Sequence, residues 1–263
     1  MTKTKEQKRN TLFLVLSGIF LTNALVAEMI GVKIFSAEAV VGLAPAHLSI
    51  LGYTLDFNLT AGVVLWPFVF ITTDIINEYF GKEGVKKISY LTALLIAYAF
   101  VVIFIATLLP PADFWMDINQ TDGSGNSFNV NYAFKTIFTQ GLGIILGSLA
   151  AFLIGQLLDV FVFHQLRKVT GSKYLWVRAT GSTLVSQLID SFVVLFIAFF
   201  VFGNWPMEQV LSVGLINYIY KFGVAILLTP LIYAGHYLID RYLGLEEASE
   251  LSEEAAAKSE GLF

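Results

Sequence analysis

Polar side chains recur in pairs inside the apolar runs of this sequence, with the two members three or four residues apart. Such spacing places both members of a pair on one face of a helix. Charged and amide groups at membrane depth are costly, so they normally face a bundle interior or a wet cavity. The pairs are Asp74 with Glu78, Gln156 with Asp159, Gln187 with Asp190, and Asn217 with Lys221. We therefore expect a polar site enclosed by helices.

A structural role accounts for part of these polar groups. By the helical rise of about 1.5 Å per residue, Asp190 and Lys221 lie near the membrane midplane, where a buried ion pair could form. Three aspartates within the spans against one lysine leave carboxylates that need donors, bound protons or a ligand. Glu28 and Glu78 lie closer to the interface, and we expect these two side chains to snorkel rather than bind a ligand.

The composition indicates the class of protein that positions these groups. Apolar residues make up 56% of the chain and charged residues 14%, against about 45–50% and about 25% in soluble domains. Several runs approach the roughly 20 residues that cross a bilayer. We predict an all-α polytopic membrane protein, a bundle of six transmembrane helices. The expected spans are residues 11–30, 59–79, 88–109, 132–163, 176–202 and 207–241.

Local signals modify two of these spans. Pro67 lies within the second span and predicts a kink or local break. The fourth span is long enough to be tilted or to begin as a surface helix. Gly143 and Gly147 give that span a small-residue side for close helix packing.

The segments outside the spans are short. Residues 48–57 place apolar residues around Gly52, which predicts a small extracellular hairpin at the membrane surface. We assign residues 1–245 to one transmembrane domain. Residues 246–263 form an acidic tail, which we expect to be a solvated or frayed helix without chemistry.

Basic residues are distributed unevenly between the two sides of the predicted bundle. Six spans place both termini on one side, and most Lys and Arg residues fall there. Lys33 and Lys135 fall on the opposite side, and Lys221 lies within the membrane. The excess of positive charge predicts that both termini are cytoplasmic.

Several chemistries lack their sequence signals. The chain has no cysteine, which removes thiolate metal sites and cysteine nucleophiles. Its histidines, His47, His164 and His236, lack metal-ligand spacing, and there is no nucleotide-binding glycine-rich loop. We expect no metal, no cofactor and no catalytic residue, although the aspartate spacing leaves a two-aspartate protease open.

Four segments together resemble a known family, the queuosine precursor transporters, also called the vitamin uptake transporter family. They are residues 67–81 with Pro67, Thr73, Asp74 and Gly81, residues 155–167 with Gly155, Gln156 and Asp159, residues 182–199 with Ser182 and Asp190, and residues 218–221 with Tyr218 and Lys221. The resemblance extends from about residue 59 to residue 230.

The resemblance implies six helices and the uptake of 7-deazaguanine bases, such as 7-cyano-7-deazaguanine, across a bacterial plasma membrane. A carboxylate suits the adjacent N–H and NH₂ groups of such a base, while its carbonyl suits an amide or lysine donor. Aromatic rings would stack on the base. The candidate substrate-binding residues are Asn23, Trp66, Phe70, Asp74, Gln156, Asp159, Gln187, Asp190, Asn217, Tyr218 and Lys221.

Other interpretations remain open at this stage. The chain could be a substrate-binding membrane subunit that needs a separate ATPase. It could also be an intramembrane aspartyl enzyme that uses two of Asp74, Asp159 and Asp190. For partners we expect a small-molecule substrate and membrane lipid and no nucleic acid, and assembly with further copies of the chain stays open.

Overall fold

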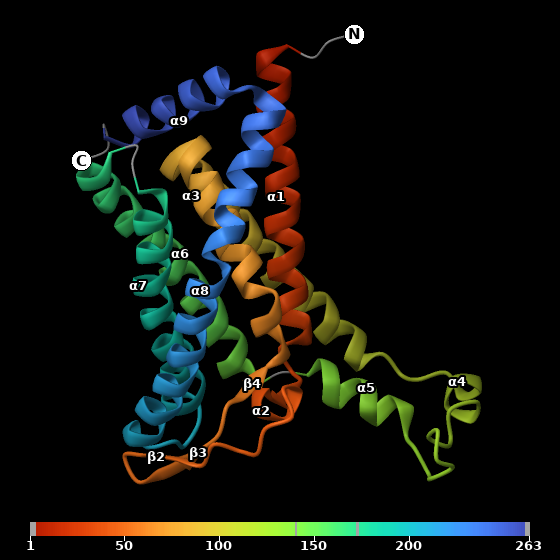
Figure 1. The fold of residues 1–263 in the computed structure, drawn as a ribbon. Helices are drawn as coiled ribbons and strands as arrows, with labels where there is room; N and C mark the ends of the chain where they lie inside the picture. Colours follow the sequence, from red (N-terminus) through yellow and green to blue (C-terminus); the bar gives the residue numbers. More distant parts are fainter. Residues whose placement is uncertain (1–3, 140, 172–173, 261–263) are drawn as a thin grey trace.

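Long apolar helices form the body of the protein in a computed structural model, which describes residues 4–139, 141–171 and 174–260 (Figure 1). Lys3 and Lys173, two of the basic residues on the side predicted to be cytoplasmic, lie outside the described residues. Among the described residues, five helical segments are long and apolar enough to cross a membrane. The main helices are α1 (Lys5–Ile30), α3 (Trp66–Leu108), α6 (Leu142–Thr170), α7 (Leu175–Leu195) with its π-helical continuation η2 (Phe196–Val201), and α8 (Met207–Leu243).

Helix α3 supplies two of the predicted spans because it breaks at Gly81. Gly81 has φ 68° and ψ −172°, a backbone conformation that glycine adopts far more readily than other residues. Figure 1 shows that the two arms of α3 meet near α9 and that both run toward the opposite end of the bundle. The all-α membrane bundle with six spans is therefore confirmed, with the second and third spans joined at Gly81.

The predicted kink at Pro67 is wrong. Pro67 occupies the first turn of α3, where a residue without an N–H leaves no intrahelical hydrogen bond unmade. The short helix η1 (Ala61–Val64) precedes it. Proline thus marks where the helix begins, and the interruption falls at Gly81.

The predicted hairpin is confirmed, and its position at the extracellular membrane surface stays a prediction. Strands β2 (Leu48–Ile50) and β3 (Tyr53–Leu55) pair antiparallel across Leu51 and Gly52, both of which have positive φ. A second antiparallel pair, β1 (Ile34–Ser36) with β4 (Asn58–Thr60), was not predicted. Between β1 and β2, the short helix α2 (Ala37–Val40) carries Glu38, whose pKa is lowered chiefly by the Phe57 backbone N–H that donates to it.

The fourth predicted span begins as a separate helix. Helix α5 (Val130–Phe138) precedes α6, which agrees with the surface-helix alternative. Together with the short helix α4 (Asp113–Asp117), α5 forms an arm that extends sideways from the bundle (Figure 1).

Glycine allows α6 to approach α7 and η2 closely. A Cβ at Gly147 would lie 3.0 Å from the Val194 carbonyl oxygen, and one at Gly143 would lie 2.5 Å from the Phe202 Cβ. Close backbone approach is the usual function of small residues in membrane helix interfaces. It brings the polar faces of α6 and α7 together, with Gly155 against Asp190.

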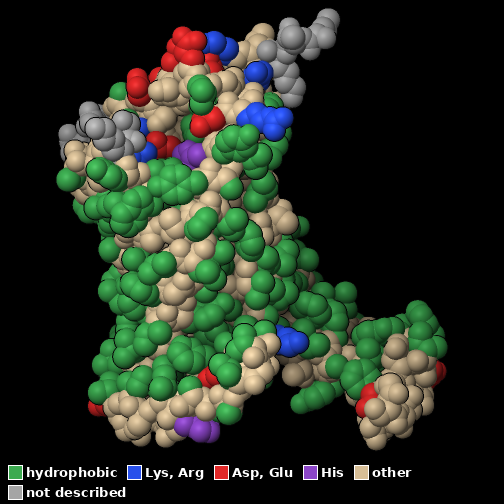
Figure 2. All heavy atoms as spheres, in the orientation of Figure 1, with side chains coloured by type: hydrophobic (Ala, Val, Ile, Leu, Met, Phe, Trp, Pro, Cys, Tyr) green, Lys and Arg blue, Asp and Glu red, His purple; other side chains and the backbone are tan. Residues whose placement is uncertain are grey.

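The expectation of a solvated C-terminal helix is wrong. Helix α9 (Leu245–Glu260) lies across one end of the bundle (Figure 1) and buries Ala248, Leu251 and Ala255. Glu247 pairs with Lys5 at 2.6 Å and also with Arg9. The hydrogen bond from Lys5 is the main cause that lowers the Glu247 pKa. Figure 2 shows basic and acidic side chains gathered at this end, next to the hydrophobic middle of the molecule.

The expectation that Glu28 and Glu78 snorkel is also wrong, because both side chains are buried. Glu78 is 5% exposed and accepts hydrogen bonds at 2.8 and 3.0 Å from Arg178. Arg167 lies 3.3 Å away, and Ser252 of α9 donates at 2.8 Å. Glu28 accepts from Ser148 at 2.7 Å. Glu78 thus connects α3, α6, α7 and α9.

This geometry predicts that Glu78→Gln strongly destabilises the protein. The substitution leaves the two arginine charges without their carboxylate, and breaking a buried ion pair typically costs about 3–5 kcal/mol. Thermal unfolding in detergent should show a clearly lower unfolding temperature for Glu78→Gln than for the wild type. Glu83→Gln is the matched control, because Glu83 is exposed and pairs with Lys86 at 3.4 Å. Equal unfolding temperatures for the two variants would contradict this role.

Candidate functional site

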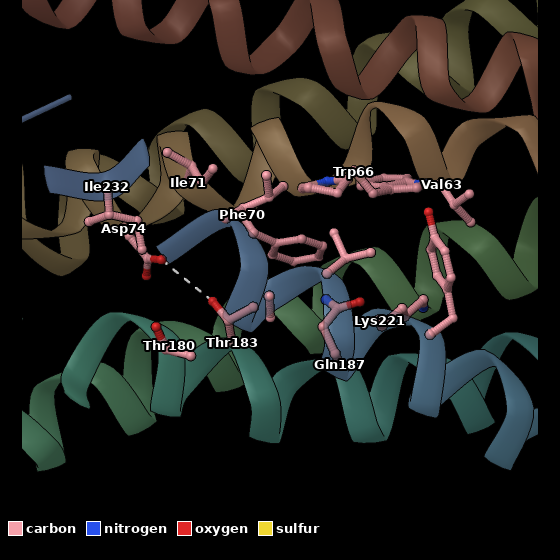
Figure 3. A pocket seen from close by; sticks show the side chains of 15 residues that line it. Val63, Trp66, Phe70, Ile71, Asp74, Thr180, Thr183, Gln187, Lys221 and Ile232 are labelled. Carbon is pink, nitrogen blue, oxygen red and sulfur yellow. Dashed lines mark hydrogen bonds between the residues drawn. The ribbon is translucent and has the colours of Figure 1, made fainter. Parts of the chain in front are cut away.

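A cleft lies between the first arm of α3 and helices α7 and α8 (Figure 3). Its walls enclose about 550 Å³ of space, a volume that includes the open mouth. The lining residues come from η1, α3, α7 and α8 and are Val63, Trp66, Pro67, Phe70, Ile71, Asp74, Thr180, Thr183, Gln187, Tyr220, Lys221, Val224, Ala225, Leu228 and Ile232.

Five of the predicted site residues line this cleft: Trp66, Phe70, Asp74, Gln187 and Lys221. Two of them form an aromatic wall, since the Trp66 and Phe70 ring centroids are 6.1 Å apart. In Figure 3, Asp74 lies at one end of the cleft and Gln187 and Lys221 lie farther along it.

The polar groups in the cleft have unused hydrogen-bonding capacity. Asp74 is 2% exposed; its Oδ2 lies 3.5 Å from the Thr183 hydroxyl, and its Oδ1 has no hydrogen-bond partner among the described residues. The Nε2 of Gln187 is likewise buried without a partner there. Such groups cost free energy unless something bonds to them. The cleft therefore offers a planar ligand both an acceptor and a donor.

Lys221 and Asp190 form the ion pair that the sequence suggested. The Lys221 Nζ donates to Asp190 Oδ2. Because an ammonium has three N–H donors, Lys221 can bond to Asp190 and still offer a donor to the cleft. Asp190 itself is not among the cleft-lining residues.

Gln156 and Asp159 lie behind the cleft, between α6 and its neighbours. Gln156 Oε1 accepts from Thr73 of α3 at 3.1 Å. Asp159, which is 0% exposed, has its Oδ1 3.1 Å from the Ser186 hydroxyl of α7. The polar faces of α6 and α7 therefore meet.

Three predicted residues lie away from the cleft. Asn23 donates to the Ile19 carbonyl of its own helix at 2.8 Å. Asn217 is half-buried, and the Tyr218 ring packs edge-on against Phe222. None of the three lines the cleft.

Sequence reasoning missed Thr180, Thr183 and Tyr220 as lining residues. Thr180, Thr183 and Gln187 are spaced i, i+3 and i+7, so they share one face of α7. That hydroxyl spacing was the available signal. Tyr220 replaces the expected Tyr218 because two residues rotate a helical side chain to a different face.

The family model described as "Putative vitamin uptake transporter" matches residues 60–235. This range contains every cleft-lining residue, from Val63 to Ile232. No solved structure matches the chain.

Three curated proteins have similar sequences. A "Probable queuosine precursor transporter" of Bacillus subtilis is 33% identical over 198 residues, 74% of this chain and 80% of that protein. One of the same name from Haemophilus influenzae is 30% identical, over 69% of this chain and 70% of that protein. The "Queuosine precursor transporter" of Escherichia coli is 32% identical, over 65% of this chain and 70% of that protein. The chain therefore belongs to the vitamin uptake transporter family, that of the queuosine precursor transporters.

Proposed function

We propose that this protein carries a queuosine precursor, a 7-deazaguanine base, across the bacterial plasma membrane. The observation that carries the proposal is the pairing of buried, unsatisfied polar groups with aromatic rings in one cleft of a membrane bundle. Asp74 Oδ1 and Gln187 Nε2 have no partner among the described residues, and Trp66 and Phe70 stand beside them. The names of the curated relatives support the same substrate class.

The cleft matches the edge of such a base group by group. Asp74 as a carboxylate accepts the ring N–H and the exocyclic NH₂ in a two-point contact. Gln187 and Lys221 supply donors for the base carbonyl. Trp66 and Phe70 provide flat apolar surface for the ring.

A cluster of hydrogen bonds around Glu78 lies next to Asp74 along α3. Glu78 follows Asp74 by one helical turn, and its bonds to Arg178 and Ser252 tie α3 to α7 and α9. Movement of a base past this point requires the contacts around Glu78 to separate, so we assign them to the closed gate of an alternating-access cycle.

We prefer a carrier to the two alternatives. The relatives are named as transporters, which favours transport over an intramembrane aspartyl reaction. Uptake of intact labelled base into liposomes that contain this chain alone separates a self-sufficient carrier from a subunit that needs an ATPase. Loss of base mass without accumulation would indicate an enzyme.

We predict that Asp74→Ala abolishes uptake. Loss of a charged partner from a buried contact should weaken base binding by about 2–5 kcal/mol. The measurement is the affinity of purified protein for 7-cyano-7-deazaguanine, taken on variants with wild-type melting behaviour.

Glu28→Gln is the matched control for Asp74→Ala. Glu28 is also a buried carboxyl, bonded to Ser148, but it does not line the cleft. The affinity of Glu28→Gln for 7-cyano-7-deazaguanine should remain close to that of the wild type. Normal affinity in Asp74→Ala would show that the base binds elsewhere.

We also propose that both termini are cytoplasmic, because the described Lys and Arg residues concentrate at the end that carries α9. The chain has no cysteine, so single cysteines report topology without background. Gly123→Cys in the loop between α4 and α5, where an added Cβ meets nothing within 4 Å, should react with an impermeant maleimide on intact cells.

The opposite side has its own reporter. Glu253 is exposed on α9, and Glu253→Cys should be labelled only after lysis. The reverse pattern, with Glu253→Cys labelled on intact cells and Gly123→Cys protected, would invert the proposed orientation.

A further inference from the structure

We propose that Asp159 binds the proton whose movement drives uptake, so that each base crosses the membrane together with one proton. This inference rests on the proposed function and adds the energy source. The proton would come from water on the outer side, reside on the Asp159 carboxyl while the base is bound, and return to water on the inner side.

The first observation is that no Lys or Arg of the described residues forms an ion pair with Asp159. Its side chain is 0% exposed, and Oδ2 has no hydrogen-bond partner among the described residues. The basic side chains of the surrounding helices pair with other carboxylates. Lys221 forms an ion pair with Asp190, and Arg178 and Arg167 form ion pairs with Glu78. A carboxylate in that position without a positive partner is strongly disfavoured, whereas a carboxylic acid is not.

The second observation is the competition for one hydroxyl proton. The Ser186 Oγ lies 3.0 Å from the Thr183 carbonyl oxygen and 3.1 Å from Asp159 Oδ1. A serine hydroxyl can donate one proton, and a carbonyl oxygen can only accept. If Ser186 donates to Thr183, the bond to Asp159 needs a proton on the carboxyl. The two contacts are satisfied together when Asp159 is protonated.

The third observation links Asp159 to the base site. Thr183 Oγ1 contacts Asp74, and Ser186, one turn along α7, contacts Asp159. The two carboxyls thus meet the same turn of α7, one facing the cleft and one behind it. A bound base that donates to Asp74 holds this carboxyl in its ionised form, and a second negative charge on the neighbouring Asp159 then becomes more costly. Base binding therefore favours a proton on Asp159.

Several titratable groups near Asp74 and Asp159 have partners of their own. Tyr79 bonds to His236 and Asp240, and Glu78 bonds to its arginines. The titratable and charged groups on the elements packed around Asp74 and Asp159 include Glu78 and Tyr79 on α3, His164 and Arg167 on α6, Arg178 and Asp190 on α7, and Tyr220, Lys221, His236 and Asp240 on α8.

A proton suits this position better than a sodium ion. Asp159 does not line the cleft. Thr183 does, and Ser186, one turn along α7, contacts the Asp159 carboxyl. Hydroxyl groups can pass a proton by exchange, whereas a metal ion would have to displace them.

The test is the pH dependence of 7-cyano-7-deazaguanine binding to the purified full chain. If one proton binds with each base, the wild-type affinity falls by up to about tenfold per pH unit on the alkaline side. Asp159→Asn carries a neutral side chain at every pH, so its affinity should lose this slope. Glu28→Gln, the matched buried carboxyl, should keep the wild-type slope. A wild-type slope in Asp159→Asn would overturn the proposal.

Two further measurements use the wild-type protein alone, so they need no variant. In weakly buffered solution, base binding should take up protons, and binding without proton uptake contradicts the inference. In liposomes, an imposed proton gradient should drive accumulation of the base above equilibrium. Accumulation driven by a sodium gradient instead would replace the proton with sodium. A wild-type chain that binds no base at any pH would refute the proposed function, and this inference with it.

Discussion

The high cost of an unpaired charge in the low-dielectric interior of a membrane protein determines how this bundle is assembled. Glu78 is neutralised by Arg178 and Arg167, and Asp190 by Lys221. Each pair joins different helices, so satisfying the charges also fixes which helices are neighbours. After these pairings, Asp74 and Asp159 have no cation on them in the described structure. The acidic groups thus divide into those that hold the bundle together and those available for binding.

The close packing of α6 and α7 makes this division possible. Gly143 and Gly147 let the backbones approach, so short hydroxyl side chains such as Ser186 reach across to the neighbouring helix. Bulkier residues at the glycines would separate the helices and leave Asp159 without even this contact. The small residues therefore set the short distance between the α6 and α7 backbones, and the polar side chains need that short distance to make contact.

The sequence predicted most of the scaffold because its signals are local. Hydrophobic length located the spans, and the positive-φ turn at Leu51 and Gly52 agrees with the expected hairpin. It predicted Asp74, Gln187 and Lys221 as site residues from their helical spacing. It failed where the outcome depends on contacts distant in sequence. The sequence does not show that Glu78 is buried, because its two arginines lie on other helices. It does not show that α9 docks either, because the basic partners of this acidic helix lie on α1. Whether Tyr218 or Tyr220 lines the cleft depends on which face of α8 packs against α3 and α7. The sequence pattern does not specify the rotation of α8 about its axis.

The docking of α9 has a consequence for how the protein is made. Chains emerge from the ribosome N-terminus first, and early segments begin to fold before later ones exist. Here α9 supplies Ser252 to Glu78 and Glu247 to Arg9, and it covers the end of the bundle where α3 turns. Until α9 has been synthesised, the basic residues of α1 and the charged cluster around Glu78 lack these partners. The end of the bundle that α9 covers can therefore reach its final packing only after the six spans have been made.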